Sequence, residues 1–153
     1  MSESPLLFDR TLIRARRRRA ASIGPAMFLL DRVADDLADR LAAVLRRFDL
    51  ALNLGTPNDV IRATLARIES IGGIVSADTA LSGTRALAPF VVADEEALPF
   101  RDAAFDLVVS ALSLQFVNDL PGALAQIRRA LKPDGLFLAA LIGGETLTEL
   151  RQR

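Results

Sequence analysis

The sequence predicts an α/β protein built on a doubly wound, mostly parallel sheet of about five strands. Three observations favour this class. Short apolar runs alternate with segments of helical periodicity along most of the chain, which is typical of parallel sheets. Turn residues separate these segments. The 153 residues, of which 51% are hydrophobic, are enough for one domain with a substantial core.

The N-terminal part of the chain is expected to be helical. Apolar residues recur at spacings of three and four between charged ones, which predicts helices over residues 5–20 and 26–48. Gly24 and Pro25 form the break between them. We therefore expect a helical cap over residues 1–48, followed by the sheet-containing core over residues 49–153.

The core contains the strand and helix signals in alternation. The predicted strands are residues 50–54, 73–77, 90–93, 105–110 and 136–141. A helix is expected over residues 59–70, and a second over residues 120–131, with Asn118 or Asp119 as its cap and Pro121 in its first turn. Residues 145–153 have the composition of a further helix. Helices between successive strands should cover both faces of the sheet.

Composition excludes several classes of function. Basic and acidic residues are equal at 19 each, so no global field draws the protein to nucleic acid. Cysteine and histidine are absent, which removes thiol nucleophiles, the usual neutral base and the commonest metal ligands, and we expect no metal site. No apolar run is long enough to cross a bilayer, so we expect no membrane insertion and a cytoplasmic location.

An arginine-rich run, RARRRR, covers residues 14–19. Such a run can bind a polyanion or can form the solvated face of a helix. Because the chain has no net charge and Asp9 precedes the run, the solvated helix face or the edge of a lid is the preferred interpretation.

Candidate binding residues stand where the predicted strands end. Ligands of doubly wound sheets bind outside the carboxyl ends of the strands. Gly55 can adopt a positive φ that lets a ligand approach the backbone, and Asp78 could accept hydrogen bonds from two vicinal hydroxyls. Asp94 and Glu95 follow the strand predicted at residues 90–93 and are further candidates. The alternatives to a binding role are a simple turn at Gly55, a strand-end cap at Asp78 and a solvated acidic loop at Asp94 and Glu95.

Residues 90–141, and above all the run ADEEALPF at residues 93–100, resemble the class I S-adenosylmethionine-dependent methyltransferases. The resemblance implies a Rossmann-like fold and S-adenosylmethionine as cofactor. It also implies that Asp78 accepts from the ribose hydroxyls and Asp94 from the adenine amino group. The full set of cofactor-binding residues that it implies is Asn53, Gly55, Asp78, Asp94, Glu95 and Ser110.

The glycine loop departs from the family pattern, which runs acidic, apolar, Gly, any, Gly, any, Gly. Asn53 stands at the acidic position, Pro57 at the second glycine and Asp59 at the third. Proline lacks a backbone donor and adds bulk. A non-catalytic binding or assembly protein is therefore the alternative to an enzyme. A nicotinamide-dependent dehydrogenase is disfavoured, because its G-x-G-x-x-G turn is absent as well.

The run LSLQF at residues 112–116 resembles the branch that contains malonyl-acyl-carrier-protein O-methyltransferase and the related complex I assembly factors. The resemblance implies that Gln115 orients the acceptor and that Phe116 forms a wall of the methyl site, although both could instead belong to the core. It implies a small-molecule or carrier-linked acceptor, and a protein partner is compatible with it.

A carboxylate acceptor needs no base, which suits a chain without histidine, cysteine or tyrosine. Hydroxylase chemistry, which is linked to the assembly factors, ranks last because no iron-ligand pattern is visible. The family continues beyond this core through another helix and an antiparallel hairpin, so a truncated core is expected and no catalytic residue is assigned.

Overall fold

A computed structural model describes residues 6–56, 58–80 and 89–144 of the chain. Its centre is a five-stranded sheet in the order β3-β2-β1-β4-β5, and every pair of neighbouring strands is parallel. The strands are β1 (Phe48–Leu54), β2 (Ile71–Asp78), β3 (Phe90–Val92), β4 (Phe105–Ala111) and β5 (Leu131–Ala140). The predicted α/β class with a parallel sheet is confirmed.

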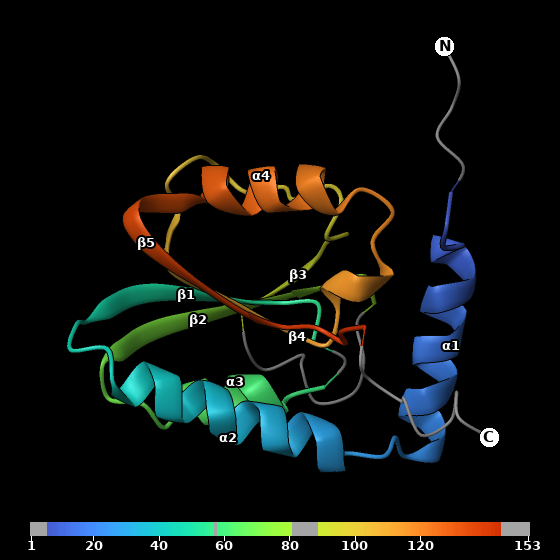
Figure 1. The fold of residues 1–153 in the computed structure, drawn as a ribbon, viewed down its shortest axis with the longest axis horizontal. Helices are drawn as coiled ribbons and strands as arrows, with labels where there is room; N and C mark the ends of the chain where they lie inside the picture. Colours follow the sequence, from blue (N-terminus) through green and yellow to red (C-terminus); the bar gives the residue numbers. More distant parts are fainter. Residues whose placement is uncertain (1–5, 57, 81–88, 145–153) are drawn as a thin grey trace.

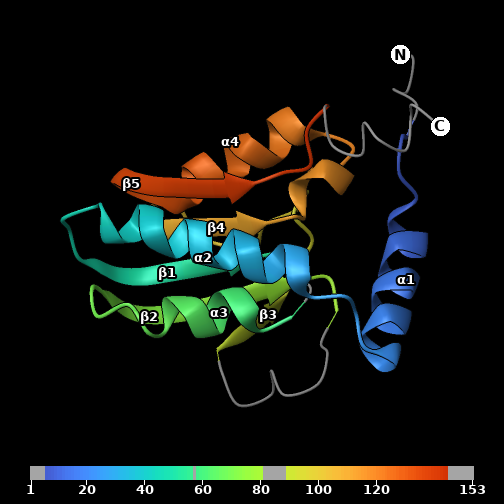
Figure 2. The same cartoon turned by 60° about the horizontal axis from the view of Figure 1, so that its bottom comes forward.

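Helices cover both faces of the sheet, as the alternating pattern predicts. The helices are α1 (Arg10–Ile23), α2 (Phe28–Ala42), α3 (Val60–Leu65) and α4 (Leu120–Ala130), with a 3-10 turn, η2, at Leu114–Phe116. Figure 1 shows α4 on one face of the sheet and α2 with α3 on the other, and Figure 2 shows the same layers from below. Helix α1 belongs to neither layer, because it stands at the end of the sheet in both views.

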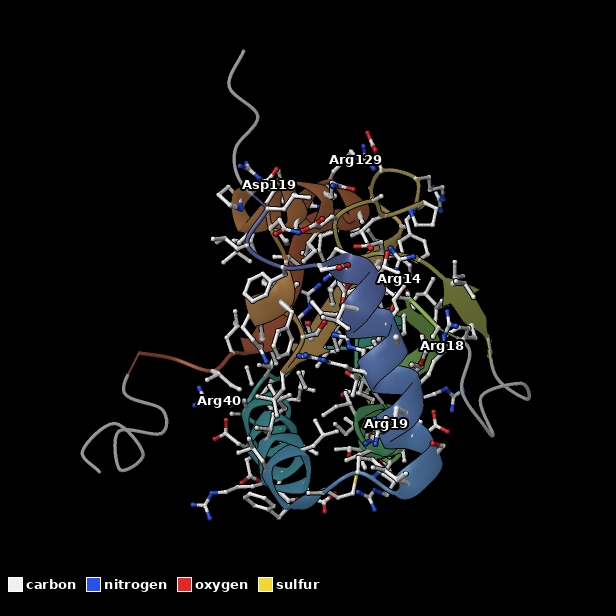
Figure 3. All side chains as sticks on the ribbon, turned by 90° about the vertical axis from the view of Figure 1, so that its right-hand side faces the viewer. Arg14, Arg18, Arg19, Arg40, Asp119 and Arg129 are labelled. Atoms are coloured by element: carbon white, nitrogen blue, oxygen red, sulfur yellow. The ribbon has the colours of Figure 1, made fainter. Side chains whose placement is uncertain are left out.

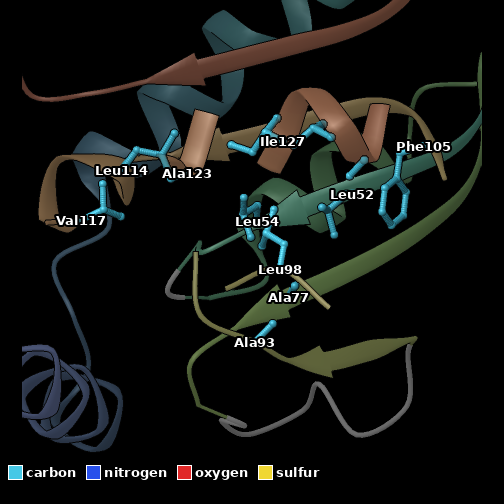
Figure 4. Close-up of a cluster of buried hydrophobic side chains, with 12 residues drawn as sticks. Leu52, Leu54, Ala77, Ala93, Leu98, Phe105, Leu114, Val117, Ala123 and Ile127 are labelled. Atoms are coloured by element: carbon cyan, nitrogen blue, oxygen red, sulfur yellow. The ribbon is translucent and has the colours of Figure 1, made fainter. Parts of the chain in front are cut away.

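The sheet separates two apolar cores. Leu52, Val108 and Ile127 belong to the core under α4, which Figure 4 shows in close-up. Leu107 and Val109 point to the opposite core, which packs against α2 and α3. Successive residues of β4 therefore alternate between the two cores, as the pleat of a strand requires. Both faces of the central strands are buried, which explains their nearly continuous apolar sequence.

The N-terminal helix boundaries differ from those predicted. The break at Gly24 is confirmed, since Gly24 has φ 81° and ends α1. Helix α1 begins at Arg10 rather than near residue 5, because Asp9 caps it by accepting hydrogen bonds from the amides of Thr11 and Leu12. Helix α2 ends at Ala42 rather than at residue 48. Phe48 is wholly buried and pairs with Ile71 as the first residue of β1.

Three further core elements differ from their predicted bounds by two residues or more at one end. Helix α3 ends at Leu65 instead of residue 70. Strand β2 begins at Ile71 and includes Gly72, where a Cβ atom would lie 2.8 Å from the carbonyl oxygen of Asp49. Strand β5 begins at Leu131 with an irregular register opposite Phe105, before its regular pairing from Leu136. The helix predicted at residues 145–153 lies outside the described residues.

Candidate functional site

Three carboxylates meet at the carboxyl edge of the sheet. Asp78 is the last residue of β2, and Asp94 and Glu95 follow β3. We call Asp78, Asp94 and Glu95 the carboxylate cluster. Asp78 is 4% exposed and Glu95 is 0% exposed, so two of the three acids are buried. Buried carboxylates need charged or hydrogen-bonding partners.

The loop that carries Asp94 and Glu95 is anchored to α4. Gln126 on α4 donates from Nε2 to the carbonyl oxygen of Glu96 at 2.7 Å, and the Leu98 amide donates to Gln126 Oε1 at 2.8 Å. Glu96 accepts hydrogen bonds from the amides of Asn118 and Asp119 at the start of that helix. These contacts fix the loop beside the strand ends.

Helix α1 lies over the carboxylate cluster and supplies its counter-charges. Arg10, Arg14 and Arg17 are spaced by four and three residues, so they share one face of the helix. Arg10 donates from Nη2 to Asp94 Oδ1 at 2.5 Å and to Glu95 Oε2, and from Nη1 to the Phe116 carbonyl oxygen at 3.0 Å. Figure 3 looks onto this helix from outside the sheet and labels Arg14, Arg18 and Arg19.

Arg17 completes the arrangement about two turns beyond Arg10 along the helix. Its Nη1 atom donates to Asp78 Oδ1 at 3.0 Å and lies 3.5 Å from Glu95 Oε1, and its Nη2 donates to Ser113 Oγ at 3.4 Å. Arg14 adds a longer ion pair with Asp94, at 3.8 Å between Nη2 and Oδ2. All three acids of the cluster therefore have arginine partners from α1.

These contacts change the acidity of two groups. Burial disfavours the charged form of Asp94, but the hydrogen bond from Arg10 and the amide of Glu96 outweigh it and hold the pKa of Asp94 below its ordinary value. Burial likewise opposes the charge of Arg10, while Asp94 and Glu95 together raise the pKa of the Arg10 guanidinium. Both groups stay charged at neutral pH.

Acidification is expected to weaken the attachment of α1. Because the folded-state pKa of Asp94 lies below the 3.8 of an unperturbed aspartate, the stability that this carboxylate contributes is complete above about pH 5. It is lost as the pH falls through the folded-state value. The check is the free energy of unfolding by urea at neutral pH and at about pH 3, for the wild type and for Arg10→Met.

The Arg10→Met variant should lose less stability on acidification than the wild type. The pKa of Asp106 is also held down, since the hydrogen bond from Lys132 outweighs its burial. Asp106 is present in both proteins, so its contribution to the pH dependence of the free energy of unfolding cancels in the comparison. Equal pH dependence in the two proteins would contradict the proposed link between Arg10 and Asp94.

Gly55 adopts the left-handed conformation that the sequence allows, with φ 73°. A Cβ atom at this position would lie 2.2 Å from Ser113 Oγ and 2.5 Å from Glu95 Oε1. The Ser113 hydroxyl donates to that same Glu95 oxygen. The open side of Gly55 is therefore filled by two side chains of the protein, in the place where the sequence predicts the close approach of a ligand.

Backbone geometry at the end of β4 directs Ser113 into the site. Leu112 has φ 54°, a left-handed value that bulky residues rarely adopt, and its amide donates to the Ala140 carbonyl oxygen at 2.8 Å. The turn leaves Ser113 0% exposed against Glu95. Strained conformations of this kind concentrate at binding sites. Sequence reasoning did not single out Ser113.

Asn53 and Ser110, two predicted cofactor-binding residues, are buried beneath the strand ends. Asn53 is 3% exposed and accepts a hydrogen bond from Thr56 Oγ1 at 2.8 Å, while its Nδ2 donates to Ser76 Oγ at 3.4 Å. Ser110 is 1% exposed, and its hydroxyl has no hydrogen-bond partner among the described residues. Within the described residues, neither side chain forms a hydrogen bond with the carboxylate cluster. Pro57 lies outside the described residues.

The two predicted acceptor-side residues lie in η2, next to α1. Phe116 packs edge-on against Phe8, with ring centroids 6.0 Å apart. A cavity of about 320 Å³ lies between η2 and α1, lined by Ile13, Arg16, Arg17, Ala20 and Phe116. Gln115 donates from Nε2 to the Leu112 carbonyl oxygen at 2.9 Å, and its buried Oε1 has no partner within the described segments.

Arg10 and Arg17 are not among the site residues predicted from the sequence. The signal that could have found them is the helical spacing of Arg10, Arg14 and Arg17, which puts three guanidinium groups on one face. For the arginine run of residues 14–19, the sequence predicts a solvated helix face or the edge of a lid. Arg16, Arg18 and Arg19 are indeed exposed, whereas Arg14 and Arg17 are partly buried against the cluster.

In the described part of the chain, no group of three or more acidic, histidine or cysteine residues could hold a metal ion. Nor does any helix in the ranges that the structure describes have the length and apolarity to cross a membrane.

Comparisons with known proteins agree on one family. The methyltransferase domain family matches residues 58–139 of the chain. The human protein named arginine-hydroxylase NDUFAF5, mitochondrial, is 46% identical over 154 residues, which cover 95% of this chain and 44% of that protein. The malonyl-[acyl-carrier protein] O-methyltransferase of Halorhodospira halophila is 38% identical over 128 residues, which cover 78% of this chain and 43% of that protein.

A solved structure supports the same fold. A chain from the complex of the Haloferax volcanii Trm112 methyltransferase activator superposes with a TM-score of 0.63 at 24% identity, and the match covers 82% of this chain and 59% of that chain. The chain spans about half the length of the curated relatives it matches. The activity, acceptor and partners of a whole protein of this kind are therefore matters for proposal.

Proposed function

Because this chain belongs to the methyltransferase domain family, we propose that it binds S-adenosylmethionine at the carboxyl edge of its sheet for methyl transfer to a small-molecule or carrier-linked acceptor. The observation that carries the proposal is the position of Asp78 and Asp94 at the ends of adjacent parallel strands. When bound, the cofactor supplies an activated methyl group.

The donor and acceptor groups of the site suit the adenosine half of this cofactor. The two oxygens of Asp78 match two vicinal ribose hydroxyls, and Asp94 can accept from the adenine amino group. The cofactor carries a sulfonium, an ammonium and one carboxylate, so its net charge is positive and is attracted by acids, although arginines of α1 neutralise the three acids of the cluster in this structure. The methionine half fits less well, since Glu95 and Ser113 fill the side of Gly55 that it would approach.

The cavity beside Phe116 is the proposed acceptor site. Its walls come from Ile13, Ala20 and Phe116, and the exposed Arg16 stands at its edge. Apolar walls with a cation at the edge suit an acceptor that carries a carboxylate. Such an acceptor needs no base, so positioning and exclusion of water would be the main tasks of the protein. The buried Gln115 Oε1 could orient an acceptor that carries a hydrogen-bond donor.

The name of the Halorhodospira halophila relative describes O-methylation of malonyl-[acyl-carrier protein]. That name supports a carrier-linked acceptor for the present chain. A carrier or another protein would then be the partner, and no nucleic acid is proposed. The cytoplasmic location stays a prediction from the sequence, and the name of the human relative describes a mitochondrial protein.

Calorimetric titration of the full-length protein with S-adenosylmethionine and with S-adenosylhomocysteine tests the proposal. We expect saturable binding of both, and no binding of NAD⁺ as the control ligand. Asp94→Asn, which removes charge but keeps the shape, should weaken binding by about tenfold, as expected for loss of a hydrogen bond to a charged group. Absence of binding of both S-adenosylmethionine and S-adenosylhomocysteine at about millimolar ligand would contradict the proposal.

A second candidate is a non-catalytic assembly or binding protein of the complex I assembly factor type. The filled side of Gly55 favours it, as does the pairing of all three acids with arginines of the same chain. A site of this chemistry could instead receive arginine side chains of a protein partner. Restoring the family pattern with Asn53→Asp and Pro57→Gly separates the two functions. If S-adenosylmethionine binds to the restored protein but not to the natural sequence, the assembly function is favoured for the natural protein.

A further inference from the structure

The arginines of α1 occupy the same carboxylate oxygens that the proposed function assigns to the adenosine. Asp78 Oδ1 accepts from Arg17 at 3.0 Å, and both oxygens of Asp94 accept from Arg10, at 2.5 and 3.4 Å. Asp78 is only 4% exposed under these contacts. An adenosine could not form its full set of hydrogen bonds with both acids while the two guanidinium groups hold them.

Helix α1 is attached by charge rather than by an apolar core. None of its residues is buried, whereas α2 buries Leu30, Ala34, Leu37 and Leu41. Ile23 at its end is 74% exposed. Elements that bury little apolar surface are the ones that open locally at low cost. The ion pairs of Arg10 and Arg17 are therefore the main attachment of the helix, together with contacts of Phe8 to Asn118 and Phe116.

The connection from α1 to α2 is not tightly packed at Gly24. Gly24 ends α1 with φ 81°, and no described atom lies within 4 Å of the position that a Cβ would take there. Partly buried ion pairs give little net stability, because the cost of removing both charges from water offsets their attraction. The ribose hydroxyls and the adenine amino group of the cofactor could donate to Asp78 and Asp94 in place of the guanidinium groups, and the net positive charge of the cofactor would offset part of the lost counter-charge.

We propose that α1 is an internal competitor for the carboxylate cluster, so that S-adenosylmethionine binds only after Arg10 and Arg17 have been displaced. This inference rests on the proposed function, since it concerns the same site. The apparent affinity for the cofactor is then reduced by the fraction of molecules in which α1 is docked.

The test compares cofactor affinity in two matched double variants of the full-length protein. Arg10→Met with Arg17→Met removes the two inward charges but keeps side chains of similar length. Arg18→Met with Arg19→Met removes two exposed charges from the same helix. We expect the inward variant to bind S-adenosylmethionine about tenfold more tightly than the wild type, and the outward variant to bind as the wild type does.

Amide hydrogen exchange of the unmodified protein provides a second measurement that does not depend on the variants folding. Addition of S-adenosylmethionine should speed exchange in α1, because the helix loses the ion pairs of Arg10 and Arg17 that are its main attachment. Slower exchange in α1, or an inward variant that binds no more tightly than the wild type, would overturn the competition while leaving the proposed function in place. Absence of binding by the wild type and by the inward variant would remove both proposals.

Discussion

Gly55→Ala is expected to destabilise the protein by at least about 2 kcal/mol, because two costs coincide at this residue. Its φ of 73° lies in the left-handed region, where a Cβ atom is strained. The added methyl group would also lie 2.2 Å from Ser113 Oγ and 2.5 Å from Glu95 Oε1. Neither neighbour can yield easily, since both are 0% exposed.

Gly24→Ala is the matched control for this substitution. Gly24 also has a positive φ, of 81°, but nothing lies within 4 Å of its hypothetical Cβ. The control measures strain alone, so the difference between the two variants measures the crowding beside Gly55. Urea unfolding followed by far-ultraviolet circular dichroism is suitable, because the chain has no tryptophan or tyrosine. Equal stability of the two variants would show that the space beside Gly55 is open.

Leu52→Ala is expected to lower the free energy of unfolding by about 2–5 kcal/mol, the usual range for removing a buried leucine. Leu52 is 0% exposed on the central strand β1 and packs in the core under α4 (Figure 4). Strand β1 pairs with β2 on one side and β4 on the other, so the surrounding backbone cannot easily close the cavity.

The matched control for the core substitution is Leu45→Ala. Leu45 is 98% exposed in the segment between α2 and β1, so the same chemical change there should alter stability by no more than about 0.5 kcal/mol. Both variants are compared with the wild type by the same urea unfolding measurement. A loss below about 1 kcal/mol for Leu52→Ala would contradict the assignment of this side chain to a rigid core.

The sequence was sufficient to predict the order and type of the core elements. Apolar runs mark all the strands of the sheet, and Asp119 caps α4 as one of the two expected residues, accepting from the amide of Gly122. It also predicted that Asp78 and Asp94 follow two strands of the sheet, at the edge where ligands of such sheets bind. The resemblance to class I methyltransferases is confirmed by the family match over residues 58–139.

Element boundaries were less predictable where tertiary packing overrides local periodicity. Phe48 continues the helical spacing of the preceding segment, but burial beside Ile71 makes it part of β1. Gly72 lies inside a strand because only a residue without a side chain can pass the Asp49 carbonyl oxygen at that distance. The local sequence does not show that Ile71 lies beside Phe48 or that Asp49 lies beside Gly72.

What the sequence by itself determined is the parallel α/β architecture and the acids at its carboxyl edge, because both follow from local patterns repeated along the chain. Only the tertiary structure decided what those acids contact. Arg10 and Glu95 are 85 positions apart in the chain, and Arg17 and Asp78 are 61 apart. Their pairing depends on where α1 lies against the sheet, which no local pattern specifies. For the same reason, the space beside Gly55 is filled by Glu95 and Ser113 although the glycine alone suggests an open approach.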